Sequence, residues 1–338
     1  MTAPRRTVLA AVTGAAVIAT SATLVRLSGE PAAISALFRC AYALPFLAVL
    51  AWREGRRLGP MAVRRRALAW LAGLIFGLDL LLWHHSIDYV GAGLATVLGN
   101  LQVFVVAFAA WALLRERPPA RLLVAAPVVF AGVVLISGLF DAAAYGSDPR
   151  LGVILGVATA PAYAAFMLIL RGCSEEGRRS AGPLAHAVAS ATVLIALAGP
   201  WQGAAGLTPH WPSHGWLLLL ALGPQVLGWV LITYALPRQP AALTALLLLI
   251  QPAGTLALSA LVLGERPSAV QLAGCAVIAL GVLYGSRRER RPGRPPSRAL
   301  DGGAGRAGRP RSQARLGTPA GLTAAEEQEA QVPKTSTV

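Results

Sequence analysis

The chain has 338 residues, of which 55% are hydrophobic and only 13% are charged, and its mean hydropathy is +0.59. This composition excludes an ordinary soluble globular protein of this length and indicates a protein that resides in a lipid bilayer. The formal net charge is +15, but the basic residues stand in short segments between apolar stretches, so we expect them to face anionic lipid and expect no nucleic-acid partner.

Ten apolar stretches follow one another, each close to the length of about 20 residues that a helix needs to cross a bilayer. In chain order they are Thr7 to Val25, Pro31 to Trp52, Ala67 to Ile87, Tyr89 to Leu114, Leu122 to Phe140, Leu151 to Leu170, Leu184 to Trp201, Gly215 to Pro237, Gln239 to Gly264 and Pro267 to Ser286. Most are uncharged, but the second contains Arg39 and the third contains Asp79. The sequence therefore predicts an all-α integral membrane protein with ten transmembrane helices.

An internal repeat relates the two halves of the chain at an offset of 265 − 116 = 149 positions. The matching positions are Gln102 and Gln251, Glu116-Arg117-Pro118 and Glu265-Arg266-Pro267, and Gly132 and Gly281. We expect one copy over residues 7–140 and the other over residues 151–286. Each copy holds five predicted helices, and an odd number makes the second copy enter the bilayer from the opposite side. Inverted repeats of this kind are typical of secondary transporters.

The arginines indicate how the chain is oriented, because basic residues in short loops stay on the cytoplasmic side. With the N-terminus inside, the inner segments hold nineteen arginines and the outer loops hold three, namely Arg26, Arg150 and Arg266. We therefore expect a multi-pass protein of the plasma membrane with both termini in the cytoplasm. Residues 287–338 are rich in Gly, Pro, Arg and Ala without apolar periodicity, which predicts a disordered basic cytoplasmic tail.

The helix before each Glu-Arg-Pro corner carries a family resemblance. It reads Leu98-Gly99-Asn100-Leu101-Gln102 through to Arg115-Glu116-Arg117 in the first copy, and Leu249-Ile250-Gln251-Pro252 through to Gly264-Glu265-Arg266 in the second. Over about residues 7–286 the chain resembles EamA-type transporters of the drug/metabolite transporter superfamily. The resemblance implies two inverted five-helix repeats around a central cavity and transport of a small metabolite such as an amino acid, nucleoside, sugar or drug. Val103 stands where the second copy has Pro252, which predicts a less kinked helix in the first copy.

Polar residues inside the spans are the informative positions for a solute site, because each is costly in hydrocarbon and faces the bundle interior or a wet cavity. An ionised Asp79 at mid-span costs roughly 2.5–3.5 kcal/mol. It faces the cavity, where it holds a cationic group or carries a coupling proton, or it makes a structural contact with Arg39, or it lies at the hydrated end of a tilted helix. Trp83 lies one helical turn further along and shares its face.

Gln102 and Gln251 occupy equivalent depths in the two copies, which suits either a solute site at the bilayer midplane or a pair of interhelical hydrogen bonds. Further polar or aromatic side chains in the spans complete the expected substrate site. The predicted substrate-binding residues are Asp79, Trp83, Asn100, Gln102, Gln225, Trp229 and Gln251.

His84, His85 and Asp88 resemble a metal-binding motif, but no second cluster supplies further ligands, so we expect neither a metal nor a cofactor. Together with Asp79 they are the only constellation that an intramembrane enzyme could use, and a non-transporting assembly protein is the other alternative. No phosphate-binding loop or nucleophile elbow accompanies them. We therefore expect no enzyme but a carrier that exports an amino-acid-like or drug-like solute; the sequence leaves a homodimer open.

Overall fold

The computed structural model describes residues 3–114, 120–136, 145–174, 178–198, 207–238, 247–248 and 250–286. All of them belong to one unit of the chain, Met1–Glu289. Over these residues the regular structure is helical and contains no strand, which confirms the all-α prediction. The Glu116-Arg117-Pro118 corner and the predicted tail at 287–338 lie outside the described residues.

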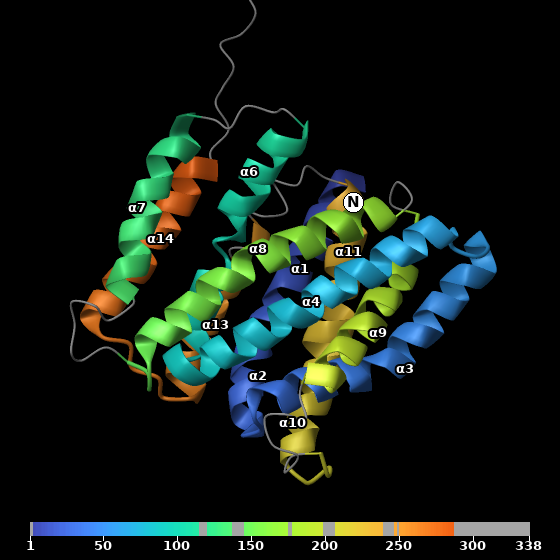
Figure 1. Ribbon diagram of the computed structural model, residues 1–338, viewed down its shortest axis with the longest axis horizontal. Helices are drawn as coiled ribbons and strands as arrows, with labels where there is room; N and C mark the ends of the chain where they lie inside the picture. Colours follow the sequence, from blue (N-terminus) through green and yellow to red (C-terminus); the bar gives the residue numbers. More distant parts are fainter. Residues whose placement is uncertain are drawn as a thin grey trace, which may run out of the picture. The chain divides into compact units, whose positions relative to one another are not determined.

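The helices follow the order of the two sequence copies (Figure 1). The first copy contributes α1 (Ala3–Ala19), α2 (Ser21–Ser28), α3 (Ala32–Leu58), α4 (Val63–Val90), α5 (Ala92–Gly99), α6 (Gln102–Leu114) and α7 (Ala120–Ile136). The second contributes α8 (Pro149–Cys173), α9 (Ala181–Ala198), α10 (Ser213–Leu220), η3 (Ala221–Gly228), α11 (Trp229–Ala235), η4 (Leu236–Arg238), α13 (Ile250–Val262) and α14 (Ala269–Ser286).

Six helical segments of the described chain are long and apolar enough to cross a membrane, judged by length and composition. They are Arg5–Ser28, Ala32–Leu58, Val63–Val90, Pro149–Cys173, Ala181–Ala198 and Ser213–Arg238. Three shorter apolar helices cover Ala92–Val106, Ile250–Val262 and Ala269–Gly281. The protein is therefore a multi-pass membrane protein.

The predicted span Tyr89 to Leu114 is interrupted at its middle, between α5 and α6. The Thr96 carbonyl oxygen accepts two bonds from Asn100, one from its backbone N–H at 3.3 Å and one from its side-chain Nδ2 at 2.9 Å. Asn100 is thus the capping residue at the end of α5. That this span is less kinked than its counterpart in the second copy stays a prediction, because residues 239–246 lie outside the described residues.

The span that begins at Ser213 also departs from a regular α-helix, because residues Ala221–Gly228 form a π-helix. Pro224 lies within it and has no N–H to donate to the preceding turn. π-helical turns are rare and are frequently found at functional sites. The irregular segment places Gln225, which is fully buried, against the first copy of the chain.

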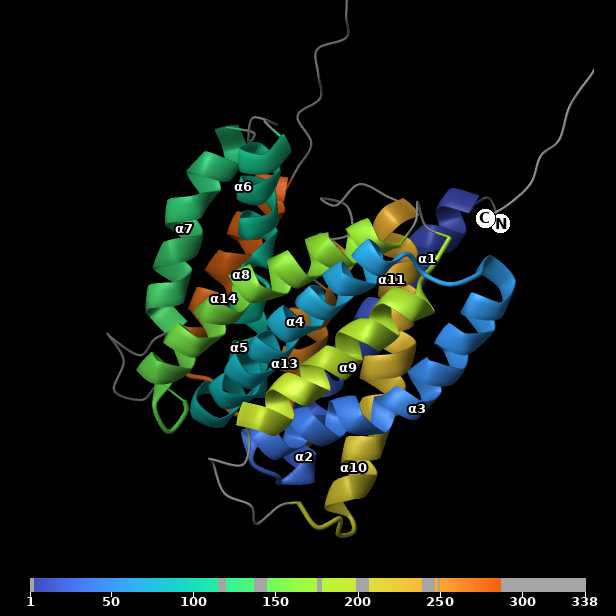
Figure 2. The same cartoon turned by 45° about the vertical axis from the view of Figure 1, so that its right-hand side comes forward.

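Most helix contacts in the bundle have an equivalent contact in which each helix is replaced by its counterpart in the other copy. In the pairs α3 and α9, and α7 and α14, a helix packs on its own counterpart, and α5 packs on α13, the counterpart of α6. The contact of α4 with α8 corresponds to the contact of η3 and α11 with α1. Figures 1 and 2 show α7 beside α14 and α4 between α8 and α9. The interior of the bundle is thus built from both copies.

The repeated glycines Gly132 and Gly281 allow α7 and α14 to approach closely. A Cβ atom on Gly132 would lie 2.8 Å from the carbonyl oxygen of Gly274, and one on Gly281 would lie 2.5 Å from a methyl group of Val129. Each glycine therefore faces the helix that carries the other. Small residues at such contacts are the usual means by which transmembrane helices pack.

Two carboxylates, the buried Glu265 and the half-buried Glu54, each bind the start of a helix in the other copy. Glu265 accepts hydrogen bonds from the backbone N–H groups of Ala92 at 2.9 Å and Gly93 at 3.2 Å, at the beginning of α5. Glu54 accepts from the N–H groups of Ala181 at 3.0 Å and Gly182 at 2.8 Å, at the beginning of α9. These bonds satisfy donors that have no partner within their own helix and place a negative charge at its positive end.

Candidate functional site

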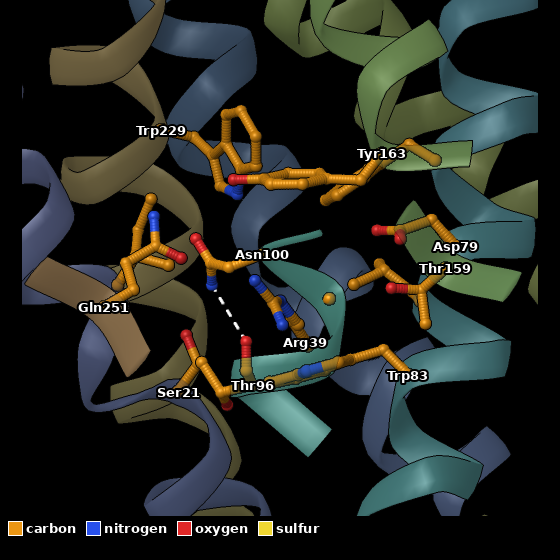
Figure 3. Close-up of a pocket in the computed structure, with 14 residues that line it drawn as sticks. Ser21, Arg39, Asp79, Trp83, Thr96, Asn100, Thr159, Tyr163, Trp229 and Gln251 are labelled. Atoms are coloured by element: carbon orange, nitrogen blue, oxygen red, sulfur yellow. Dashed lines mark hydrogen bonds between the residues drawn. The ribbon is translucent and has the colours of Figure 1, made fainter. Parts of the chain in front are cut away.

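A cavity of about 60 Å³ lies inside the bundle, where both copies of the chain meet (Figure 3). Its walls come from α1 to α5 of the first copy and from α8, α11 and α13 of the second. The lining residues are Ile18, Ser21, Arg39, Phe76, Asp79, Leu80, Trp83, Thr96, Gly99, Asn100, Thr159, Tyr163, Trp229 and Gln251. Polar and aromatic side chains dominate this list, in contrast to the apolar surface of the spans.

Two opposite charges line this cavity. Arg39 comes from α3 and is 3% exposed, and Asp79 comes from α4 and is 6% exposed. The Asp79 carboxylate lies beside Thr159 of α8. In the described part of the chain no direct ion pair joins Arg39 to Asp79, although their charges are near enough to attract each other. A guanidinium and a carboxyl group, which can carry opposite charges, therefore face the same cavity.

Arg39 is held in place by Gln225 and Trp83. Its Nε–H donates to Oε1 of Gln225 at 2.7 Å, and its guanidinium carbon lies 5.8 Å from the centre of the Trp83 ring. A guanidinium has five N–H donors, so the bond to Gln225 leaves most of them for another acceptor. Planar N–H pairs of this kind match the geometry of a carboxylate.

Aromatic rings form the rest of the walls. Tyr163 and Trp229 meet edge to face with ring centres 5.6 Å apart, and Figure 3 shows them at the end of the site opposite Trp83. Trp229 is fixed from behind by Phe166 at 4.9 Å and by Phe76 at 5.4 Å. The site thus combines charged groups with a rigid apolar surface, as ligand pockets commonly do.

Several polar atoms at the cavity are buried without a hydrogen-bond partner. They are Ser21 Oγ, Asn100 Oδ1, Trp229 Nε1 and Gln251 Nε2. A buried polar group that stays unpaired costs about 1–3 kcal/mol, so four of them around one cavity call for water or a polar ligand as a partner. Both donors and acceptors are available in this set.

The structure brings five of the seven predicted substrate residues to the cavity, namely Asp79, Trp83, Asn100, Trp229 and Gln251. The other two do not line it. Gln225 lies behind Arg39 and orients it. Gln102 is fully buried, with neither amide atom hydrogen-bonded, and lies near the Tyr163 hydroxyl.

Sequence reasoning missed three lining residues that complete the site. It considered Arg39 only as a structural contact of Asp79, although an arginine inside an apolar span is itself a strong signal. Thr159 and Tyr163 flank Pro161 on α8, one turn apart, and nothing in their local sequence distinguishes them from packing residues. Their role follows from the fold, which sets α8 against α4.

The motif of His84, His85 and Asp88 does not form a site in the structure. His84 is fully buried, its Nδ1 pairs with the carbonyl oxygen of Leu80 at 2.7 Å, and its ring packs on Trp83. Among the described residues these three side chains are not brought together as a group of metal ligands.

The two sequence copies match a family model described as "EamA-like transporter family", over residues 5–138 and again over residues 150–286. The chain belongs to the EamA-like transporter family. Members of this family are membrane transporters and not enzymes, which confirms the expectation that the chain is not an enzyme. The two matches also confirm that the chain contains two EamA repeats.

A solved structure titled only "Crystal structure of protein" is similar in fold to this EamA-like chain. Its TM-score is 0.55 at 16% sequence identity, and the match covers 82% of this chain and 95% of that chain. At this identity the similarity shows the fold alone. No curated protein matches the chain.

Proposed function

We propose that this EamA-like protein is a secondary carrier for a zwitterionic, amino-acid-like or drug-like metabolite. The observation that carries the proposal is the pair of opposite charges, Arg39 and Asp79, which face one cavity without a direct ion pair. A solute with a carboxylate and an ammonium group would give each buried charge a partner. Because the two charged groups are not paired with each other, they favour a solute that carries both a carboxylate and an ammonium group.

In the proposed complex the solute carboxylate binds the free N–H groups of Arg39, and its ammonium group binds the carboxylate of Asp79. The aromatic walls of Trp83, Tyr163 and Trp229 then hold the apolar part of the solute. The unpaired polar atoms of Asn100 and Gln251 add hydrogen bonds. Asp79 can also carry a coupling proton in the absence of solute, because a neutral carboxyl group is far less costly in a membrane than an ionised one.

We further propose that transport occurs by alternating access of two inverted repeats, over 7–140 and 151–286, with ten transmembrane helices. The equivalent helix contacts of the two copies support this arrangement. The excess of arginines in the segments expected on the cytoplasmic side supports it as well. The break between α5 and α6 and the π-helix at Ala221–Gly228 are places where helices can bend beside the site. In this arrangement both termini are cytoplasmic, the carrier works in the plasma membrane as an exporter, and one chain forms the whole cavity.

The test is a flux assay with purified protein in lipid vesicles, with and without a pH gradient. Zwitterionic amino acids should be transported in preference to sugars and nucleosides, and Asp79→Asn should abolish the flux at a normal protein level. If the flux is the same with and without the pH gradient, transport is not coupled to protons. Full activity of Asp79→Asn would remove the proposed role of that carboxylate.

A further inference from the structure

Three metal-ligating side chains meet at the end of the bundle remote from the start of α1. Glu30 lies in the turn between α2 and α3, His210 precedes α10, and His214 lies in its first turn. One ligand atom of each lies within 4.8 Å of those of the others, and Glu30 Oε1 is 3.2 Å from His210 Nε2. Figures 1 and 2 show α2 and α10 at this same end. None of the three residues lines the central cavity.

The hydrogen bonds of both histidines leave Nε2 directed at this cluster. His210 Nδ1 lies 3.3 Å from the carbonyl oxygen of Thr208, which can only accept, so Nδ1–H donates to it and Nε2 is the ring nitrogen that faces Glu30. His214 Nδ1 lies 2.7 Å from the Tyr42 hydroxyl, whose oxygen can accept an Nδ1–H in the same way. An outer hydrogen bond on the opposite ring nitrogen is the usual arrangement of metal-bound histidines.

Two of the ligand atoms, Nε2 of His214 and Oε1 of Glu30, are buried and make no regular hydrogen bond. Oε1 of Glu30 has the ion-pair contact of 3.2 Å with His210 Nε2, and His214 Nε2 has no hydrogen-bond partner. A proton on one ring nitrogen can join only two of the three atoms. A metal ion would satisfy all three at once, which is why the cluster indicates a cation and not merely a protonated histidine.

The geometry and the chemistry of the donors fit one class of ion. Nitrogen and oxygen ligands lie about 2.0–2.2 Å from Zn²⁺, so two ligand atoms of a tetrahedral site are roughly 3.3 Å apart. The 3.2 Å between Glu30 and His210 agrees with this value. The two separations that involve His214 are at most 4.8 Å, and the His210 side chain is 56% exposed and can rotate to shorten its own distance to His214. Two imidazoles favour Zn²⁺ and similar transition metals over Ca²⁺ or Mg²⁺.

We propose that Glu30, His210 and His214 form a divalent transition-metal site of the Zn²⁺ class. This proposal differs from the sequence-based expectation that the chain holds no metal. The ion joins the α2–α3 turn of the first copy to the start of α10 in the second, so its binding holds the two copies together at this end. Metal binding stands independently of the transported solute. Its effect on transport, which is to slow exchange between the two access states, rests on the proposed function.

The test uses the full-length protein carrying an affinity tag without histidine, stripped with a chelator and titrated with Zn²⁺ in a calorimeter. The wild type should bind one ion per chain. Glu30→Gln, His210→Ala and His214→Ala should each weaken binding at least about tenfold. His186→Ala is the matched control, since it removes one of the five histidines of the chain at a position outside the cluster, and it should bind as the wild type does.

A second measurement keeps the proposal testable if a ligand variant fails to fold. Tyr42→Phe leaves all three ligands in place and should weaken Zn²⁺ binding up to about tenfold through loss of the His214 hydrogen bond. X-ray absorption of the Zn²⁺-loaded wild type should show two imidazole ligands with oxygen, and no sulfur. The proposal is overturned if the wild type binds no Zn²⁺, if His214→Ala binds it unchanged, or if the absorption spectrum shows sulfur ligands.

Discussion

The Nε–H of Arg39 donates to Oε1 of Gln225 at 2.7 Å, and this bond connects the two copies of the chain at the edge of the cavity. Arg39 belongs to α3 in the first copy, and Gln225 belongs to the π-helix of the second. Any movement of one copy against the other therefore acts directly on the guanidinium that lines the cavity. Gln225 is a positioning residue, because it does not line the cavity itself.

Gln225→Leu should weaken solute binding roughly tenfold or more, because a buried hydrogen bond to a charged group contributes about 1.5–3 kcal/mol. The apparent KM for a zwitterionic solute should rise while the amount of protein in the membrane stays normal. Thr192→Val serves as the control, because that hydroxyl bonds the carbonyl of Val188 within α9. An unchanged KM in Gln225→Leu would show that Arg39 needs no such support.

Removal of the Glu265 side chain should destabilise the protein without changing the site chemistry. Glu265→Ala leaves the N–H groups of Ala92 and Gly93 without their acceptor, and the loss of a helix cap costs about 0.5–2 kcal/mol. Thermal unfolding in detergent should show a lower melting temperature. Asp148→Asn is the control, since an asparagine can still accept the bond from Leu151 and should leave the melting temperature unchanged.

Gly132→Leu should force α7 away from α14, because a side chain at this position meets Ile278 and the carbonyl of Gly274. Overpacking of a close contact costs about 1–3 kcal/mol. The matched control is Ala131→Leu at the neighbouring position, which is exposed and has room for the larger side chain. If both variants melt at the same temperature, the glycine is not needed for this helix contact.

The inverted arrangement predicts that the two Glu-Arg-Pro corners face opposite sides of the membrane. Arg266→Cys should react with a membrane-impermeant thiol reagent on intact cells, and Arg117→Cys should react only after the cells are permeabilised. The natural cysteines Cys40, Cys173 and Cys275 are buried, so they should add little background. Labelling of both new cysteines from the same side would contradict the inverted arrangement and the mechanism built on it.

The sequence predicted the class of the fold well, since apolar length and the 149-residue repeat depend only on local composition and on the match between the copies. It also singled out Asp79 and Trp83, which line the cavity, because polar and aromatic residues stand out in an apolar helix and their spacing fixes a shared face. The interruption between α5 and α6 was missed, because an asparagine inside an apolar stretch does not by itself end a helix.

Relations across long sequence distances were beyond the reach of sequence reasoning. Gln225 was expected to bind solute but instead holds Arg39, which lies 186 positions away. His210 and His214 meet Glu30 only because α10 packs against α2 and α3. In the sequence, the adjacent His84 and His85 resemble a metal-binding motif more than the distant His210 and His214 do. In the fold, His84 is buried against Trp83.

Competition by solute analogues against binding of a zwitterionic amino acid tests the central claim most directly. The analogues are its amide, which lacks the carboxylate, and its deaminated acid, which lacks the ammonium group. In the wild type both should bind at least about tenfold more weakly than the parent, as expected for loss of one buried charge pair. Arg39→Gln should no longer distinguish the parent from the amide, and Asp79→Asn should no longer distinguish it from the deaminated acid. If both variants keep the discrimination of the wild type, these two side chains do not bind the charges of the solute.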